Sequence, residues 1–186
     1  MMTMLELLKR LRCVSQFDAR DLEPEVLERV LLAASWTPSA ADVQPWEFIV
    51  IQDDEQKQAL CETLLDSLLR ARVGGAERRS WISDAPVILV LCMDRIRAKA
   101  RYGEIGEKLF GPQDTGAALQ NLRLVALEIG IKSCVVREFD QEQISELLAL
   151  PDHICPLTLV ALGYSDVEPS QKTGLPMEDY VHWETW

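Results

Sequence analysis

The sequence predicts a single domain of the α/β or α+β class, built as a sandwich of helices on a central sheet. Segments with helical spacing alternate along the chain with short apolar segments of strand length. One of these, PVILVLCM at residues 86–93, is apolar throughout, which is typical of a strand covered on both faces. The 186 residues suffice for one full core, so we expect residues 1–186 to fold as one unit.

Five helices are expected from apolar residues that recur on one face and from residues that start or stop a helix. They cover residues 3–12, 23–35, 54–73, 114–129 and 140–150. Pro24 stands in the first turn of the second helix, and Gly130 is a favoured cap for the fourth. Asp140 and Gln143 resemble a capping box, and Pro151 stops the helix that they open.

Four strands are expected between these helices, at residues 47–52, 86–93, 133–136 and 157–164. The run at 86–93 marks the centre of the sheet. After the last strand the chain has turn residues and then Trp183 and Trp186, which are too apolar for a free tail. We expect this tail to pack, on the domain or on a second subunit.

Composition argues against several functions. The net charge of -11 and the pI near 4.7 argue against a nucleic-acid or anionic-membrane surface, because phosphate binding needs clustered Lys and Arg. No apolar run approaches the roughly 20 residues of a membrane span, so we expect a cytoplasmic protein. His153 and His182 show no metal-ligand spacing. Buried, reduced thiols are expected at the five cysteines, which lack CxxC spacing: Cys13, Cys61, Cys92, Cys134 and Cys155.

The stretch TPSAADVQPW before the first strand is expected to be a fixed loop. Pro38 and Pro45 exclude a helix and favour an extended conformation at the residue before each of them. Asp42 and Gln44 can form paired hydrogen bonds and Trp46 offers a flat face, which suits a planar heterocycle with an amide edge. The alternative is an ordinary connection between helix and strand with a buried Trp.

Several motifs together resemble the nitroreductase family in order and spacing, over nearly the whole chain. They are FD at residues 17–18, EVLERVLLAA, PSAADVQPWEFIV, APVILVLC, DTGAALQNLRLVALEIGIKS, LLALPD and PLTLVALGY. The resemblance implies an α+β, three-layer sandwich with a mostly antiparallel central sheet flanked by helices. It also implies a homodimer with exchanged C-terminal segments, and FMN bound at the dimer interface.

The same resemblance implies electron transfer from NADH or NADPH to nitroaromatics, quinones or similar small acceptors, in two alternating half-reactions. The flavin carries this chemistry, so no catalytic protein residue is required. The loop would lie against the isoalloxazine ring. Cofactor-binding positions implied in the loop, in the fourth helix and at or after the end of the third strand are Pro38, Ser39, Asp42, Gln44, Asn121, Val136, Arg137 and Glu138.

The chain departs from the family mainly where the FMN phosphate is expected. Family members carry an R-x-S-x-R-x-F motif, and alignment on Phe17 places Leu11, Cys13 and Ser15 at its first three positions. Neither cation is matched. We expect an altered phosphate site made by the neighbouring Arg10 and Arg12, together with Cys13, Ser15 and Lys172.

Two further departures affect the same ligand. Gly174 stands where a C-terminal phosphate-binding Arg is expected, and Asp42 replaces an Asn in the loop. A carboxylate can accept a hydrogen bond from flavin N3–H but cannot donate one. Each lost charge-assisted bond costs about 1.5 to 3 kcal/mol, so weaker FMN binding is expected, with riboflavin or no flavin as alternatives.

Two functional hypotheses follow. The favoured one is an FMN-dependent NAD(P)H oxidoreductase, because the loop with Gln44 and Trp46 and the helix with Asn121 are kept. The alternative is a dimer with the same fold that has lost tight FMN binding and acts as a non-enzymatic binding or structural protein.

Overall fold

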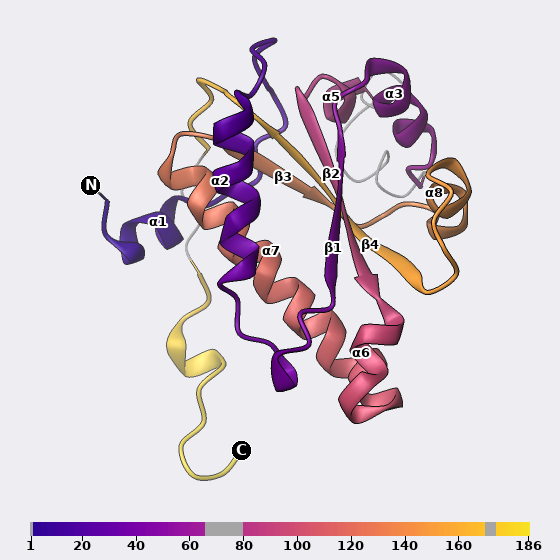
Figure 1. Cartoon of the computed structure of the whole chain (residues 1–186). Coiled ribbons are helices and arrows are strands. Elements are labelled where there is room, and N and C mark those ends of the chain that lie inside the picture. The colour runs from indigo at the N-terminus through magenta and orange to yellow at the C-terminus, as the bar shows by residue number, and fades with distance from the viewer. Residues whose placement is uncertain (1, 66–79, 170–173) are drawn as a thin grey trace.

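A single antiparallel sheet forms the centre of the computed structural model, which describes residues 2–65, 80–169 and 174–186 (Figure 1). Its four strands lie in the order β1-β2-β4-β3, and every neighbouring pair is antiparallel. The strands are β1 (Trp46–Ile51), β2 (Val87–Asp94), β3 (Lys132–Val136) and β4 (Ile154–Gly163). The sheet predicted from the four apolar segments is therefore confirmed, with its two longest strands at the centre.

Helices cover both faces of this sheet. On one face α2 and α7 pack against each other, and on the other face α3, α5 and α8 gather (Figure 1). The helices are α1 (Met4–Arg10), α2 (Pro24–Ser35), α3 (Asp54–Glu62), α5 (Ser80–Ser83), α6 (Arg95–Tyr102), α7 (Gly111–Glu128) and α8 (Gln141–Leu147). Shorter helical turns are η1 (Ala40–Asp42), the π-helical η3 (Gly106–Phe110) and η4 (Met177–Asp179). This is the three-layer α+β sandwich that was expected.

Strand β2 is buried on both faces, as its apolar run predicts. Val87, Leu89 and Leu91 pack with α2 and α7, while Ile88 and Val90 point to the opposite face and pack with α3 and α8. Full burial of such a side chain contributes about 1.5 to 3 kcal/mol. The hydrophobic core therefore lies in two layers, one on each side of β2 and β4.

The predicted helix at 54–73 is wrong at its C-terminal side, because α3 ends at Glu62. The Thr63 hydroxyl donates to the Leu60 carbonyl oxygen at 2.7 Å and closes the last turn. Leu64 then forms a β-bridge with Phe139, which takes the backbone out of helical geometry. Residues 66–73 of that prediction lie outside the described residues.

Helix α6 and turn η3 stand in a stretch that carries no sequence prediction. Four of the eight residues of α6, RIRAKARY, are cationic, so the helix lacks the apolar stripe that marks the other helices. Gly106 allows a close approach here, since a Cβ atom would lie 2.2 Å from the Ala98 carbonyl oxygen. Smaller differences are that α7 begins at Gly111 and that β4 begins at Ile154.

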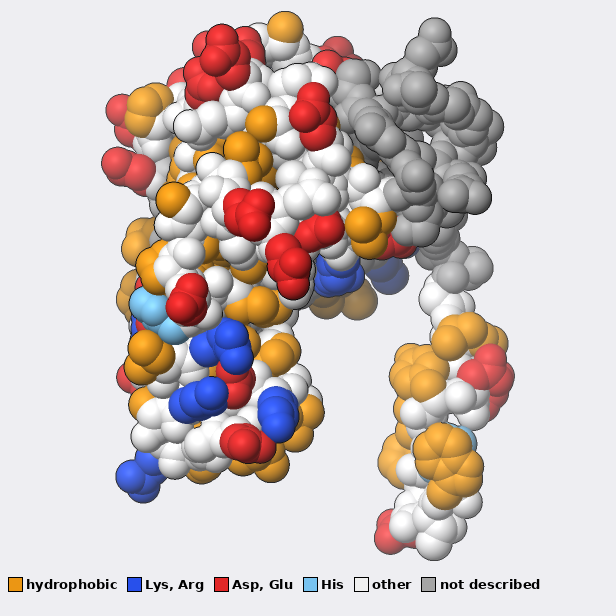
Figure 2. All heavy atoms as spheres, turned by 90° about the vertical axis from the view of Figure 1, so that its right-hand side faces the viewer, with side chains coloured by type: hydrophobic (Ala, Val, Ile, Leu, Met, Phe, Trp, Pro, Cys, Tyr) orange, Lys and Arg blue, Asp and Glu red, His pale blue; other side chains and the backbone are white. Residues whose placement is uncertain are grey.

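The C-terminal tail after β4 runs away from the rest of the chain (Figure 2). Trp183 is 78% exposed and Trp186 is 100% exposed, so these side chains do not pack on the core of their own chain. Packing on a second subunit stays a prediction. None of the helices in the described residues is long and apolar enough to cross a membrane.

The N-terminus of α2 is fastened to the residue that follows β4. The Tyr164 hydroxyl donates to a Glu23 carboxylate oxygen at 2.7 Å, and Arg20 pairs with the other carboxylate oxygen at 2.6 Å. The Arg20 guanidinium also lies over the Tyr164 ring, 3.8 Å from its centroid. The hydrogen bonds from Tyr164 and then from Arg20 lower the pKa of Glu23 to about 2.

We expect the Glu23 carboxyl to titrate near pH 2 in the folded protein, well below its ordinary 4.5. Because the folded-state pKa is lowered, this contribution to stability is present above pH 4.5 and is lost as the pH falls toward 2. Carbon-13 NMR of the side-chain carboxyl measures the midpoint, and Tyr164→Phe should raise it. A wild-type midpoint near 4.5 would contradict the network.

Candidate functional site

The loop between α2 and β1 has a left-handed backbone at three residues. Ala41, Asp42 and Gln44 have φ angles of 51°, 55° and 46°, which cost about 1 to 2 kcal/mol each for residues other than Gly. Within the loop, the Gln44 backbone N–H donates to the Ser39 hydroxyl at 2.9 Å. The Gln44 side-chain amide donates to Asp42 Oδ1 at 3.3 Å. The polar groups of Ser39, Asp42 and Gln44 are thereby gathered at one place.

The extended conformation expected for Gln44 before Pro45 is therefore wrong. Pro45 disfavours a right-handed helical residue before it, and Gln44 avoids that region by becoming left-handed. Its conformation is set by hydrogen bonds at both backbone groups, since Ser39 accepts from its N–H and Arg97 donates to its carbonyl oxygen. The loop is fixed, as predicted, but by polar contacts as well as by the two prolines.

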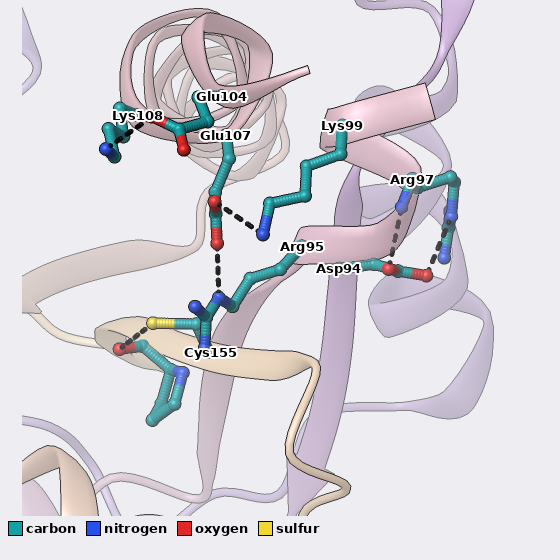
Figure 3. A network of polar contacts seen from close by, with 9 residues as sticks. Asp94, Arg95, Arg97, Lys99, Glu104, Glu107, Lys108 and Cys155 are labelled. Carbon is teal, nitrogen blue, oxygen red and sulfur yellow. Dashed lines mark hydrogen bonds and ion pairs between the residues drawn. The ribbon is translucent and has the colours of Figure 1, made fainter. Parts of the chain in front are cut away.

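Arg97 ties this loop to the end of β2. Its Nη1 donates to the Gln44 carbonyl oxygen at 2.8 Å, its Nε donates to Asp94 Oδ2 at 3.3 Å, and its Nη2 contacts Glu47. Next to this contact the Asp94 backbone N–H donates to the Pro45 carbonyl oxygen at 2.7 Å. Figure 3 shows Arg97 and Asp94 facing each other, apart from the ion pairs of Arg95.

Helix α7 holds the same loop from the other side. Near the start of the helix, Asp114 Oδ2 accepts a hydrogen bond from the Ala40 backbone N–H at 2.9 Å. Two turns later, the Asn121 side-chain amide donates to the buried Thr37 hydroxyl at 2.9 Å. Asn121 thus contacts the residue that begins the loop.

A second polar corner lies where the segment after α1 runs beside β3. Cys13 forms a parallel bridge with Ser133, and the Val14 N–H donates to the Ser133 carbonyl oxygen at 3.1 Å. Arg123 of α7 enters this corner. Its Nε donates to the Ser133 hydroxyl at 3.1 Å, and its Nη2 lies 3.4 Å from the Arg12 carbonyl oxygen and 3.8 Å from the Cys13 sulfur.

One helix therefore serves both polar regions. Asp114 and Asn121 contact the loop, while Arg123 contacts the segment after α1. At about 1.5 Å per residue, Asp114, which contacts the loop, and Arg123 are separated by about 13 Å along the axis of α7. In Figure 1 the loop with η1 lies at the lower end of α7, and α1 lies beside the upper half.

A separate charged network fastens α6 to η3. The Glu107 carboxylate accepts a hydrogen bond from Arg95 Nε at 2.5 Å and pairs with Lys99 Nζ at 2.9 Å (Figure 3). The bond from Lys99, followed by the bond from Arg95, lowers the pKa of Glu107. Beside it, Arg95 and Cys155 line a pocket of about 390 Å³ under α8. No group of three or more His, Cys, Asp or Glu that could hold a metal ion occurs among the described residues. We assign this network a structural role.

Comparison with known proteins places this geometry in a family. The sequence profile described as the nitroreductase family matches residues 8–164. That match covers most of the 186 residues. This chain belongs to the nitroreductase family.

Individual relatives agree with that assignment. A Methanothermobacter thermautotrophicus protein named "Putative NADH dehydrogenase/NAD(P)H nitroreductase" is 29% identical to this chain, and the match covers 100% of this chain and 88% of the relative. A Bacillus subtilis protein named FMN reductase (NAD(P)H) is also 29% identical, over 94% of this chain and 71% of the relative. The crystal structure of a nitroreductase family protein from Clostridium difficile superposes with a TM-score of 0.82, at 28% identity and with 100% of both chains covered.

The predicted loop residues of this nitroreductase-family chain lie close together. Ser39, Asp42 and Gln44 are joined by hydrogen bonds, and Pro38 precedes them on the same loop. Asn121 reaches this group through the Thr37 hydroxyl. These placements agree with a shared role in binding, which stays a prediction.

The predicted phosphate residues lie around the other corner. Arg10 and Ser15 are exposed, while Arg12 is half-buried and donates from Nη1 to the Leu11 carbonyl oxygen at 2.6 Å. Cys13 is exposed, so the expectation of five buried thiols is wrong at this position, because the segment after α1 runs along the edge of β3 with one side open. It is also wrong at Cys155, which is only half-buried because it lines the pocket under α8. Lys172 lies outside the described residues, and Gly174 is exposed.

The cofactor-binding residues predicted at and after the end of β3 differ in exposure. Val136 is 1% exposed and belongs to the core, so only its backbone can reach a ligand. Arg137 and Glu138 follow it and are exposed. Both charged side chains therefore lie at the surface just past the end of β3, whereas Val136 has a packing role.

Sequence reasoning missed three residues that position this site, namely Arg97, Asp114 and Arg123. Asp114 stands first in the DxxxxxQN pattern, so the motif offered a signal. Arg123 interrupts the apolar sequence LRLVAL, and a charge in an otherwise apolar helix is also a signal. Arg97 lies among other cations of α6 and carries no comparable mark.

Replacement of Arg97 by Gln should loosen the loop, because it removes a charge-assisted hydrogen bond to the Gln44 carbonyl oxygen. Hydrogen exchange of the backbone amides of residues 39–44 should become about tenfold faster, measured by mass spectrometry or NMR. Arg95→Gln is the matched control, since Arg95 lies on the same helix but pairs with Glu107. Equal exchange in both variants would show that Arg97 does not hold the loop.

Proposed function

We propose that this chain is an FMN-dependent oxidoreductase that transfers electrons from NADH or NADPH to nitroaromatic, quinone or similar small acceptors, in two alternating half-reactions. The observation that carries the proposal is the constrained loop with Ser39, Asp42 and Gln44, in a chain of the nitroreductase family. A relative over most of this chain is named an FMN reductase, and another a putative NAD(P)H nitroreductase.

The loop residues fit the polar edge of a flavin ring. Gln44 and Asp42 are already paired through one donor and one acceptor, which leaves the Gln44 amide oxygen and a second Asp42 oxygen for a ligand. An Asp42 carboxylate can accept from a ring N–H group, and its charge would disfavour a reduced, anionic ring. The loop would therefore both orient a flavin and lower its reduction potential.

The corner near Cys13 fits the phosphate end of FMN. Arg123 donates to the Arg12 carbonyl oxygen and Arg12 donates to the Leu11 carbonyl oxygen, so both guanidinium groups contact the same short backbone segment. The Ser133 hydroxyl is buried and orients Arg123. When bound there, FMN would supply the redox chemistry, while the side chains hold and orient it. A base or nucleophile from the protein is not required for this role.

We further propose that the functional unit is a homodimer in the cytoplasm. The tail presents an apolar surface that one chain leaves uncovered (Figure 2). Its exposed large side chains are Leu175, Met177, Tyr180, Trp183 and Trp186. A second copy, which carries the same tail, would cover this surface by exchange, and five free cysteines fit a reducing compartment.

The second candidate function is a dimer of the same fold that binds no flavin tightly and serves as a binding or structural protein. The observation in its favour is that Leu11, Ser15 and Gly174 carry no charge at positions where the family places phosphate-binding cations. It ranks second because Arg123 brings a positive charge to the backbone at Arg12 and Cys13, where the family motif is expected.

Purified protein should retain flavin absorbance bands after incubation with FMN and desalting. It should then oxidise NADH or NADPH when a nitroaromatic or a quinone is supplied. The measurements are the visible spectrum and the loss of absorbance of the reduced nicotinamide. A protein that stays colourless after incubation with FMN would contradict the first function and favour the second.

Light scattering after size-exclusion chromatography should give the mass of two chains for the full-length protein. Deletion of residues 174–186 should shift the mass toward one chain, because it removes the exposed apolar tail. Tyr164→Phe serves as the control variant, because it changes a contact within one chain and leaves the tail intact. A full-length protein that remains a monomer at micromolar concentration would overturn the dimer.

A further inference from the structure

Arg123 is a half-buried cation without a carboxylate partner among the described residues. It stands in the apolar stretch LRLVAL of α7, where burying a guanidinium is costly unless its charge is balanced. Its hydrogen bonds go to the Ser133 hydroxyl, the Arg12 carbonyl oxygen and the Cys13 sulfur. These groups satisfy its N–H donors, but none of them carries the balancing negative charge of an acidic side chain.

The corner around Arg123 contains a second guanidinium. Arg12, whose carbonyl oxygen contacts Arg123, is itself half-buried and folds back onto the Leu11 carbonyl oxygen. The chain has 30 acidic residues and 19 basic ones, so carboxylates are abundant elsewhere on its surface. The Arg123 guanidinium, which no carboxylate of the described residues balances in this acidic protein, indicates a site for an anion that comes from outside the chain.

The contacts of Arg123 leave one nitrogen of its guanidinium group for such an anion. Nε and Nη2 are used by the protein, whereas Nη1 has no hydrogen-bond partner among the described residues. The neighbouring Cys13 side chain is exposed, so the corner opens to solvent. A guanidinium that is oriented by fixed contacts at two of its nitrogens and keeps the third for a ligand suits a phosphate group.

We propose that Arg123 is the principal phosphate-binding cation of the flavin site, with Arg12 beside it. The proposal rests on the proposed function and adds the residue by which this chain would distinguish FMN from riboflavin. The motif cations are missing at Leu11 and Ser15, but Arg123 contacts Cys13, which lies between them. The positive charge is thus supplied from helix α7, which contacts the same backbone segment.

This role differs in a measurable way from a purely structural one. If Arg123 only joined α7 to Ser133 and Arg12, its loss would affect every flavin equally through the shape of the site. If it binds phosphate, its loss must affect FMN and leave riboflavin unchanged, because riboflavin has the same ring and ribityl chain without the phosphate. The ratio of the two affinities therefore reports the phosphate contact alone.

The experiment measures the dissociation constants of FMN and riboflavin for flavin-free, full-length protein, by quenching of flavin fluorescence. In the wild type FMN should bind more tightly than riboflavin. Arg123→Gln should weaken FMN binding by about 10- to 100-fold and leave riboflavin binding unchanged. Arg123→Lys, which keeps the positive charge, should lose less affinity for FMN than Arg123→Gln does. Arg29→Gln is the matched control, because Arg29 is exposed and its ion pair with Glu128 is long, at 3.9 Å.

The outcomes separate this proposal from the function on which it rests. Equal wild-type affinity for FMN and riboflavin would overturn the role of Arg123 and leave flavin binding intact. An equal loss for both flavins in Arg123→Gln would also overturn it. A wild type that binds neither flavin would instead overturn the proposed function itself, and the role of Arg123 with it.

A second measurement needs no variant at position 123 and so does not depend on its folding. Cys13 is exposed beside Arg123, whereas Cys92 is buried and burial raises its pKa to about 12. Cys13 should therefore be the thiol that reacts fastest with a thiol reagent. The kinetic phase that disappears in Cys13→Ser is the reaction of Cys13. Saturating FMN should slow that phase more than saturating riboflavin does. Equal protection by the two flavins would overturn the proposal.

Discussion

The burial of strand β2 on both faces is the constraint from which the rest of this structure follows. One face must be covered by α2 and α7, and Leu119 and Leu122 of α7 belong there to the same hydrophobic cluster as Leu89 and Leu91 of β2. When one side of a helix is held by such contacts, the side chains on its other sides can contact the neighbouring segments of the chain. The polar residues of α7 therefore face the loop before β1 at one end and the segment after α1 at the other.

The loop shows how this support is used. Left-handed backbone at Ala41, Asp42 and Gln44 costs about 3 to 6 kcal/mol. Hydrogen bonds that involve Ser39, Arg97, Asp114 and Asn121 contribute about 4 to 9 kcal/mol in total, since two of them involve charged groups. The polar side chains of Asp42 and Gln44 are thus held in place before any ligand arrives, which reduces the entropy lost on binding.

The sequence was most informative where one local rule decides the structure. The apolar run of β2, the strand before Gln52 and the two prolines of the loop each predicted their elements, because burial and ring geometry act over a few residues. Contacts between distant segments were not visible. The end of α3 depends on the bridge from Leu64 to Phe139, and the backbone of Gln44 depends on Arg97, which lies 53 positions later. No local pattern encodes either contact.

In the candidate site, too, some residues could be predicted from a local motif and others could not. The loop residues could be named from their motif, because the motif is contiguous. The corner beside Cys13 could be named only in part, because the sequence indicated Arg12 and Cys13 but not Arg123, which lies on α7. Arg123 is adjacent to Cys13 only through the packing of α7 beside β3, so the phosphate-binding role that we propose for it follows from the fold and not from its neighbours in sequence.

A crystal structure of the protein with FMN would test the central claim most directly, because it locates the phosphate. The account predicts phosphate oxygens within hydrogen-bonding distance of the Arg123 guanidinium, with the ring against the loop that carries Asp42 and Gln44. A phosphate held by other residues, with Arg123 still bound only to Ser133, Arg12 and Cys13, would contradict it.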